Sequence, residues 1–255
     1  MSTPVHAAER DRLTSGRVRL ARRVVDELGG RYSTELGIDV DAGDAEVERW
    51  FLAATLFGTR IASSVAKRTF GVLDVAGLTR IARARSIEWD DLVALLDAGG
   101  YTRYDFRTAS RLHALADAIN ERHEGNVAHI GRTFTSYARL RDALDALPGW
   151  GPVTIGLFLR ELRGVWHGAN PPIAERAERA SQHLGLVDRA QHTMLPHLAR
   201  LADACEVDLR DLESGLVRLS VSHHNLMDEC PGADTCTVLA HETSTSERPT
   251  RKDTP

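Results

Sequence analysis

Apolar residues recur at helical spacing along most of the chain. Between residues 45 and 220 they fall three and four positions apart, which places them on one face of an α-helix, and period-two alternation is nearly absent. Asp44, Ser86 and Ser136 are expected N-caps of three such stretches, and Pro152 suits the first turn of another. Further helices are expected near residues 174–185, 190–204 and 208–220. The pattern predicts an all-α fold.

The two ends of the chain differ from its middle. Residues 1–30 predict an arginine-rich helix diluted by acidic residues, whereas residues 239–255 are polar and rich in Pro, Thr and Ser, which predicts a disordered tail. No apolar run approaches the roughly 18 residues that a membrane span needs. The polar N-terminus lacks the apolar segment of a signal peptide, so we expect a cytoplasmic protein, nucleoid-associated in a prokaryote.

Composition narrows the possible functions. The 255 residues carry a net charge of -4, which excludes a generally polybasic protein, and the three cysteines argue against a disulfide framework. Any polyanion would therefore have to bind a localised basic surface.

A glycine- and proline-rich turn lies between two predicted helices at residues 147–154, LPGWGPVT. Gly149 and Gly151 allow a tight turn and a close approach of a ligand to the backbone. Pro152 then begins a helix whose free N–H groups could receive a phosphate oxygen, with Thr154 as a further donor. From spacing alone, an ordinary turn between two helices explains the segment equally well.

Neighbouring segments fall in the same register as this turn. They are residues 54–69 (ATLFGTRIASSVAKRT), 99–101, 123–127 (HEGNV), 168–172 (GANPP), Arg179 and residues 184–186 (LGL). Together with LPGWGPVT they resemble the helix-hairpin-helix superfamily of base-excision DNA glycosylases, the endonuclease III-like proteins, over roughly residues 45–190.

The resemblance implies a two-lobed helical protein that binds duplex DNA as a monomer. One lobe would span residues 45–165 and end in the hairpin, and the other would combine residues 1–44 with 166–225. A damaged or mismatched base would be flipped out of the duplex into the cleft between them, because its glycosidic bond cannot be reached inside the stack.

Two positions depart from the family pattern. Bifunctional members place a nucleophilic lysine where this chain has Val153, so Schiff-base chemistry is not expected. The family aspartate that stabilises the developing sugar cation falls on Ala174, whose methyl group cannot do so. Three explanations stay open: an engineered Asp→Ala change, a protein that binds DNA without cutting it, or another acid, with Glu175 as the first candidate.

Other residues match DNA-contacting positions of the family. Thr59 and Arg60 stand where relatives fill the gap left by the flipped base, although Arg60 is equally well explained as a solvated charge. Lys67 is a candidate phosphate contact. Tyr101, Tyr104 and Trp150 are candidates for the base pocket, although packing in the helical core explains each of them more simply.

The resemblance also raises the question of a cofactor. Many relatives bind an iron–sulfur cluster through four cysteines near the C-terminus, but here only Cys230 and Cys236 keep the spacing, and the other slots fall on Ser220 and Met227. An intact cluster is therefore not encoded. His223 and His224 with the two cysteines could form a zinc site. Unligated residues explain the segment more simply, so no cofactor is expected.

The sequence thus predicts a monofunctional DNA glycosylase that hydrolyses the N-glycosidic bond of a damaged or mismatched base, with weak or no turnover because of Ala174. The alternative is a catalytically silent module that binds damaged or distorted DNA. A third interpretation is a helical interaction protein in which the hairpin is only a turn.

Overall fold

The computed structural model describes residues 4–59, 61–188, 193–224 and 226–240, and these residues form helices and connecting turns without a strand. The chain divides into two compact units. We call residues 32–171 the central unit, and residues 1–31 together with 172–255 the terminal unit. The prediction of an all-α fold is confirmed for the described residues.

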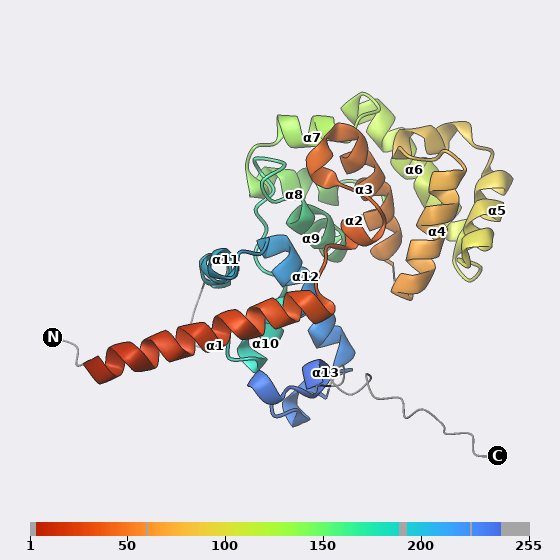
Figure 1. Ribbon diagram of the computed structural model, residues 1–255. Helices are drawn as coiled ribbons and strands as arrows, with labels where there is room; N and C mark the ends of the chain where they lie inside the picture. The colour runs from red at the N-terminus through yellow and green to blue at the C-terminus, as the bar shows by residue number, and fades with distance from the viewer. Residues whose placement is uncertain (1–3, 60, 189–192, 225, 241–255) are drawn as a thin grey trace, which may run out of the picture. The chain divides into compact units, whose positions relative to one another are not determined.

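Helix α3 is the core element of the central unit. Its residues from Trp50 to Leu56 are all buried, as expected for a helix that is apolar around most of its circumference. The Trp50 indole donates to the carbonyl of Phe158 at 3.2 Å, which ties α3 to α9. The elements of this unit, labelled in part in Figure 1, are α2 (Tyr32–Glu35), η1 (Val40–Ala42), α3 (Asp44–Phe57), α4 (Ser63–Val75), η2 (Ile81–Ser86), α5 (Trp89–Gly99), α6 (Asp105–His123), α7 (Ala128–Thr133), α8 (Tyr137–Asp145) and α9 (Pro152–Glu161).

Helix α12 is the core element of the terminal unit, where it packs against α1 and α10 (Figure 1). The approach of α1 to α12 is close at Gly215, where a Cβ atom would lie 2.9 Å from the Val24 side chain and 3.1 Å from its carbonyl oxygen. The elements of this unit are α1 (Pro4–Leu28), α10 (Glu175–His183), α11 (Met194–Cys205), α12 (Leu209–Ser222), η3 (Met227–Glu229), η4 (Ala233–Thr235) and α13 (Thr237–Ala240).

Several helix ends differ from those that the sequence predicts. Gly43 is the N-cap of α3, and Asp44 is its first residue. Ser86 ends the 3-10 helix η2, and α5 begins only at Trp89. Ser136 is the N-cap of α8 as predicted, although its side chain makes no capping hydrogen bond.

The unit boundaries also differ from the predicted lobes. Residues 166–171 were expected with the terminal helices but belong to the central unit, and the same holds for residues 32–44. A buried carboxylate explains this placement, because Glu161 accepts the backbone N–H groups of Tyr32 at 2.8 Å and Ser33 at 2.9 Å. At the other end, the predicted disordered tail begins too early: Leu239 is buried and lies in α13. Residues 241–255 lie outside the described part of the chain.

Candidate nucleic-acid interface

The segment 147–154 connects α8 to α9 in a tight turn. The N–H of Trp150 donates to the carbonyl of Leu147 at 3.1 Å, and Gly149 takes a positive φ of 78° at the corner. The Trp150 ring anchors the turn to α3: it stacks on Phe51 with centroids 4.2 Å apart, and its N–H donates to Thr55 Oγ1 at 3.2 Å. The turn is therefore held by the core of the central unit.

The two glycines of the turn have different surroundings. A Cβ atom on Gly149 would lie 2.1 Å from Cδ of Arg111, in a backbone conformation that already disfavours side chains. Gly151 has an ordinary extended backbone (φ -139°, ψ -178°), and a Cβ atom there would have open space around it. Local packing thus does not require glycine at position 151.

Gly151 is the N-cap of α9, and no side chain caps this helix. Pro152 occupies the first turn and is exposed, as is Val153, with 76% of its surface accessible. The N-terminus of α9 therefore presents backbone N–H groups at an open surface, which is the geometry that favours an anion. Thr154 is buried and packs against Gly58, where a Cβ atom would lie 1.9 Å from its hydroxyl oxygen.

Arg111 brings positive charge next to the turn. Burial lowers its pKa, whereas the neighbouring Tyr101 raises it. Within the described part of the chain, its Nε and Nη2 atoms have no hydrogen-bond partner. A guanidinium beneath Gly149 adds to the potential of the α9 N-terminus. Sequence reasoning did not select this residue, because nothing in its spacing places it at the turn.

Of the other expected DNA contacts, Thr59 lies near the turn, next to Gly58, whereas Lys67 belongs to α4. Thr59 follows α3, and its hydroxyl oxygen lies 2.8 Å from the Leu56 carbonyl oxygen and within hydrogen-bond reach of the Tyr101 hydroxyl. Lys67 forms an ion pair with Glu35. Arg60 lies outside the described residues.

Of the three aromatic candidates for the base pocket, two are core residues. Tyr101 has no exposed surface, and its hydroxyl donates to the Leu56 carbonyl at 2.8 Å. Trp150 is also buried, and its ring stacks on Phe51. Tyr104 is half-buried, with the guanidinium of Arg103 5.7 Å from its ring centre. Tyr104 is therefore the most exposed of the three.

Ala174 lies in the terminal unit as the N-cap of α10, with φ -59° and ψ 135°. Its N–H donates to Oε1 of Glu213 at 2.9 Å. Glu213 belongs to α12 and is fully buried, so its carboxylate ties the start of α10 to α12. The fallback acid Glu175 is exposed at the next position. An acidic residue on the apolar face predicted for residues 208–220 was the signal that could have identified Glu213.

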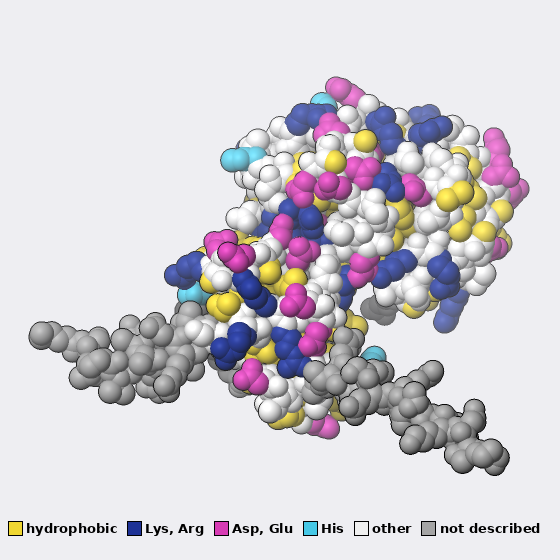
Figure 2. Space-filling model, in the orientation of Figure 1, with side chains coloured by type: hydrophobic (Ala, Val, Ile, Leu, Met, Phe, Trp, Pro, Cys, Tyr) yellow, Lys and Arg dark blue, Asp and Glu magenta, His cyan; other side chains and the backbone are white. Residues whose placement is uncertain are grey.

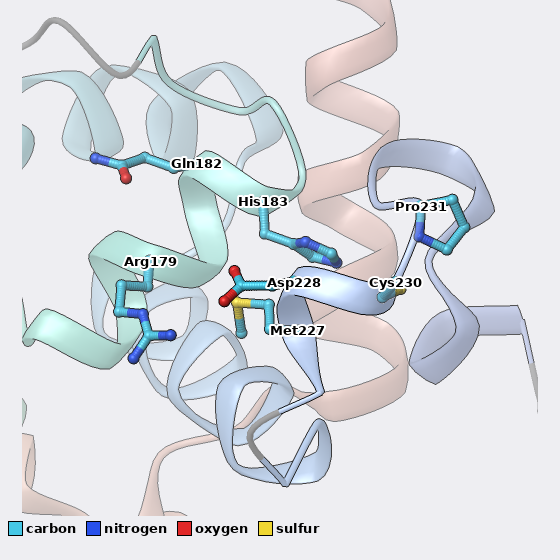
Figure 3. A pocket seen from close by; sticks show the side chains of 7 residues that line it. All are labelled: Arg179, Gln182, His183, Met227, Asp228, Cys230 and Pro231. Carbon is cyan, nitrogen blue, oxygen red and sulfur yellow. The ribbon is translucent and has the colours of Figure 1, made fainter.

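Two adjoining hollows flank α10 in the terminal unit. One is lined by Glu175, Arg176 and Arg179, and the other extends from Arg179 to Cys230 (Figure 3). Arg176 and Arg179 are exposed. This face of α10 therefore combines one carboxylate with two guanidinium groups immediately after the Ala174 position.

The candidate metal ligands also lie in the terminal unit. His223, Cys230 and Cys236 come together, but the fourth member of the group is His183 rather than His224. Burial raises the pKa of the Cys230 thiol, but hydrogen bonds from the side chain and backbone of Thr237 outweigh it, so that the pKa falls to about 5. Sequence spacing could not identify His183, which lies 40 residues before His223.

The fold and these sites define a class of protein: an all-helical chain of two compact units, with a glycine-rich helix hairpin in one and a cysteine–histidine cluster in the other. The chain matches no protein-family model, and no curated protein sequence is significantly similar to it. Across the described residues, no helix combines the length and the apolar character needed to cross a bilayer.

Proposed function

We propose that the chain binds duplex DNA through the turn at residues 147–154 and is a base-excision glycosylase of the helix-hairpin-helix type. The observation that carries the proposal is the start of α9. Gly151 leaves the N-terminus of this helix uncapped and unobstructed, although local packing would tolerate a side chain there. Glycine is also an ordinary N-cap residue, but here it leaves the free N–H groups of α9 open to the close approach of a phosphate.

The chemistry that this proposal implies is hydrolysis rather than lyase chemistry. Val153 stands exposed where a nucleophile would have to lie, and it offers none. Water would attack the sugar carbon, and a carboxylate would stabilise the developing cation. Ala174 supplies no carboxylate, and Glu213 beside it is enclosed by the protein. We therefore expect weak or no turnover from the chain as it stands.

The same observation favours a second candidate, a catalytically silent module that recognises damaged or distorted DNA. Such a module needs the hairpin but not the acid, which fits a methyl group at position 174. Both functions require a localised basic surface. On the face of the molecule in Figure 2, Lys and Arg side chains are interspersed with Asp and Glu rather than gathered in one patch. Because phosphate contacts by Lys and Arg contribute to either function, binding should be salt-dependent.

A pair of glycine substitutions in the same helix tests the proposal. Gly151→Ala obstructs the α9 N-terminus without a clash, whereas Gly156→Ala adds the same methyl group to open space one turn later. Binding of each variant to a labelled duplex that carries an abasic-site analogue is measured by fluorescence anisotropy over a series of salt concentrations. We expect Gly151→Ala to weaken binding about tenfold, or about 1.4 kcal/mol, and Gly156→Ala to bind like the unaltered chain.

Fluorescence also serves as the folding control, because all four tryptophans lie in the central unit with the hairpin. An unchanged emission spectrum shows that a variant keeps its core. Equal affinity of the two variants would refute the hairpin as the DNA contact. Absence of any salt-dependent binding would favour a helical interaction protein instead.

A further inference from the structure

Four potential metal ligands converge in the terminal unit. His183 is the last residue of α10, His223 is the C-cap of α12, and Cys230 and Cys236 bracket η4. Their ligand atoms all lie within 4.8 Å of one another. In a tetrahedral zinc site, bonds of about 2.3 Å to sulfur and about 2.0 Å to nitrogen place the ligand atoms about 3.3 to 3.8 Å apart. The four ligand atoms would therefore need to move only slightly closer together to bind a zinc ion.

We propose that His183, His223, Cys230 and Cys236 bind one zinc ion. Two imidazoles and two thiolates in tetrahedral reach are a donor set that suits zinc, and a single ion fits between ligand atoms this close. An iron–sulfur cluster needs more room between its ligands and relies mainly on cysteine. The inference is independent of DNA binding, because it rests on other residues.

The His223 ring is already oriented as a metal ligand. Its Nδ1 lies 2.8 Å from the carbonyl oxygen of Leu219, an acceptor, so Nδ1 carries the proton and Nε2 keeps a free lone pair. That Nε2 atom faces the Cys236 sulfur at 3.5 Å. A ligating histidine commonly donates its other N–H to a carbonyl group in this way.

His183 contributes a buried nitrogen without a partner. Within the described residues, no group forms a hydrogen bond with its Nε2 atom. Figure 3 shows the ring extending from α10 toward the Cys230 side chain, and the His183 and His223 ring centres are 4.9 Å apart. An unpaired buried nitrogen is unfavourable, and coordination of an ion would satisfy it. The hollow beside Cys230 gives the ion a path to the site.

The loop that carries the cysteines is shaped for the same purpose. The Cys230 sulfur accepts the N–H of Thr237 at 3.4 Å and lies 3.5 Å from its hydroxyl oxygen, which are contacts that favour a thiolate. Gly232 turns with φ 73°, and a Cβ atom there would lie 2.5 Å from the carbonyl oxygen of His183. The loop passes over the end of α10 at a distance that only glycine allows.

Four protein ligands leave no coordination position for water or substrate, so the ion has a structural role. It would join the C-terminal ends of α10 and α12 to the segment 227–240, whose Leu239 and Cys236 are buried in the core of the terminal unit. Loss of the ion should therefore release this segment.

Metal content of the purified full-length chain provides the test. We expect one zinc per chain by mass spectrometry of the metal, and a large loss in Cys230→Ser and His183→Gln. The matched controls are Cys205→Ala and His224→Asn, a buried cysteine and an exposed histidine outside the group, and both should keep the zinc. Asparagine suits position 224 because the backbone φ there is 47°.

A reconstitution experiment needs no variant. After removal of the metal with a chelator, cobalt should bind at one equivalent and give the visible bands of a tetrahedral thiolate site. Thr237→Val removes one contact to Cys230 and should weaken binding by about 10-fold or more. Zinc retained by both ligand variants would overturn the proposal. So would a chain that takes up neither metal, or one that holds iron with visible absorption.

Discussion

Replacement of Ala174 by aspartate restores the carboxylate that the helix-hairpin-helix resemblance places at this position. The backbone is suited to the change, since an N-cap with φ -59° and ψ 135° lets a short acceptor side chain bond the free N–H groups of Arg176 or Ala177. No side chain caps α10 at present. Ala174→Asn is the matched control, because it supplies the same cap without the charge.

The magnitudes follow from the surroundings of this position. A new cap adds about 1 kcal/mol to the stability of the terminal unit. Glu213 opposes the aspartate, because its carboxylate already accepts the N–H of residue 174. Two carboxylates about 6 Å apart repel by about 3 kcal/mol at an effective dielectric constant of about 20. We therefore expect Ala174→Asn to stabilise the terminal unit by about 1 kcal/mol, and Ala174→Asp to destabilise it by about 2 kcal/mol because the repulsion exceeds the gain from the cap.

Activity should show the opposite order. A group that stabilises developing charge contributes about 3–4 kcal/mol, which corresponds to a factor of about 100–1,000 in rate. The three proteins are compared in single-turnover reactions on duplexes with uracil, a thymine mispair, an oxidised pyrimidine or an alkylated purine, followed by alkaline cleavage of abasic sites. Base release by Ala174→Asp alone supports the glycosylase proposal and identifies the substrate. If no variant cuts any duplex although all bind DNA, the enzymatic proposal is refuted.

Two buried acids give further predictions for the central unit. Tryptophan fluorescence reports the unfolding of this unit. Glu161→Gln leaves one of the two N–H groups of Tyr32 and Ser33 without an acceptor, so it should lower the free energy of unfolding by about 1–3 kcal/mol, whereas the exposed Glu121→Gln should have almost no effect. Burial raises the pKa of Glu48 above its usual value of 4.5, so the folded state binds the proton more tightly than the unfolded state. The free energy of unfolding therefore falls as the pH rises from 4.5 to the raised pKa of the folded state. Glu48→Gln mimics the protonated form and should flatten this fall in urea midpoints; an unchanged slope would contradict the reasoning.

Helical periodicity predicted the class of fold because the core is formed by residues at regular spacing. The start of α9 at Pro152 was also predictable, since proline at this position needs no partner for a backbone N–H. Patterns within a short stretch of sequence could not predict features that depend on a residue far away in the chain. Residues 32–44 joined the central unit because Glu161 accepts their first N–H groups, a contact across more than 120 positions.

The candidate sites show the same division. The hairpin could be predicted, because its glycines and prolines act on their own neighbours in the chain. Arg111 beneath Gly149 and Glu213 beneath Ala174 could not, because each reaches its position by packing of separate helices. His183 is the clearest case: the sequence offered His223, His224 and the two cysteines only as a possible group and favoured unligated residues, whereas the fold brings the end of α10 to the cysteines.

The sites divide between the two units, and this separates the possible functions. The proposed DNA contact at Gly151 lies in the central unit, whereas the proposed catalytic position Ala174 and the proposed zinc ligands lie in the terminal unit. A chain that loses DNA affinity on Gly151→Ala but gains no base release on Ala174→Asp would be a binding module. Zinc removal should leave tryptophan emission unchanged, since every tryptophan lies in the central unit. If DNA affinity also survives zinc removal, the proposed zinc site and the segment 227–240 are not needed for binding.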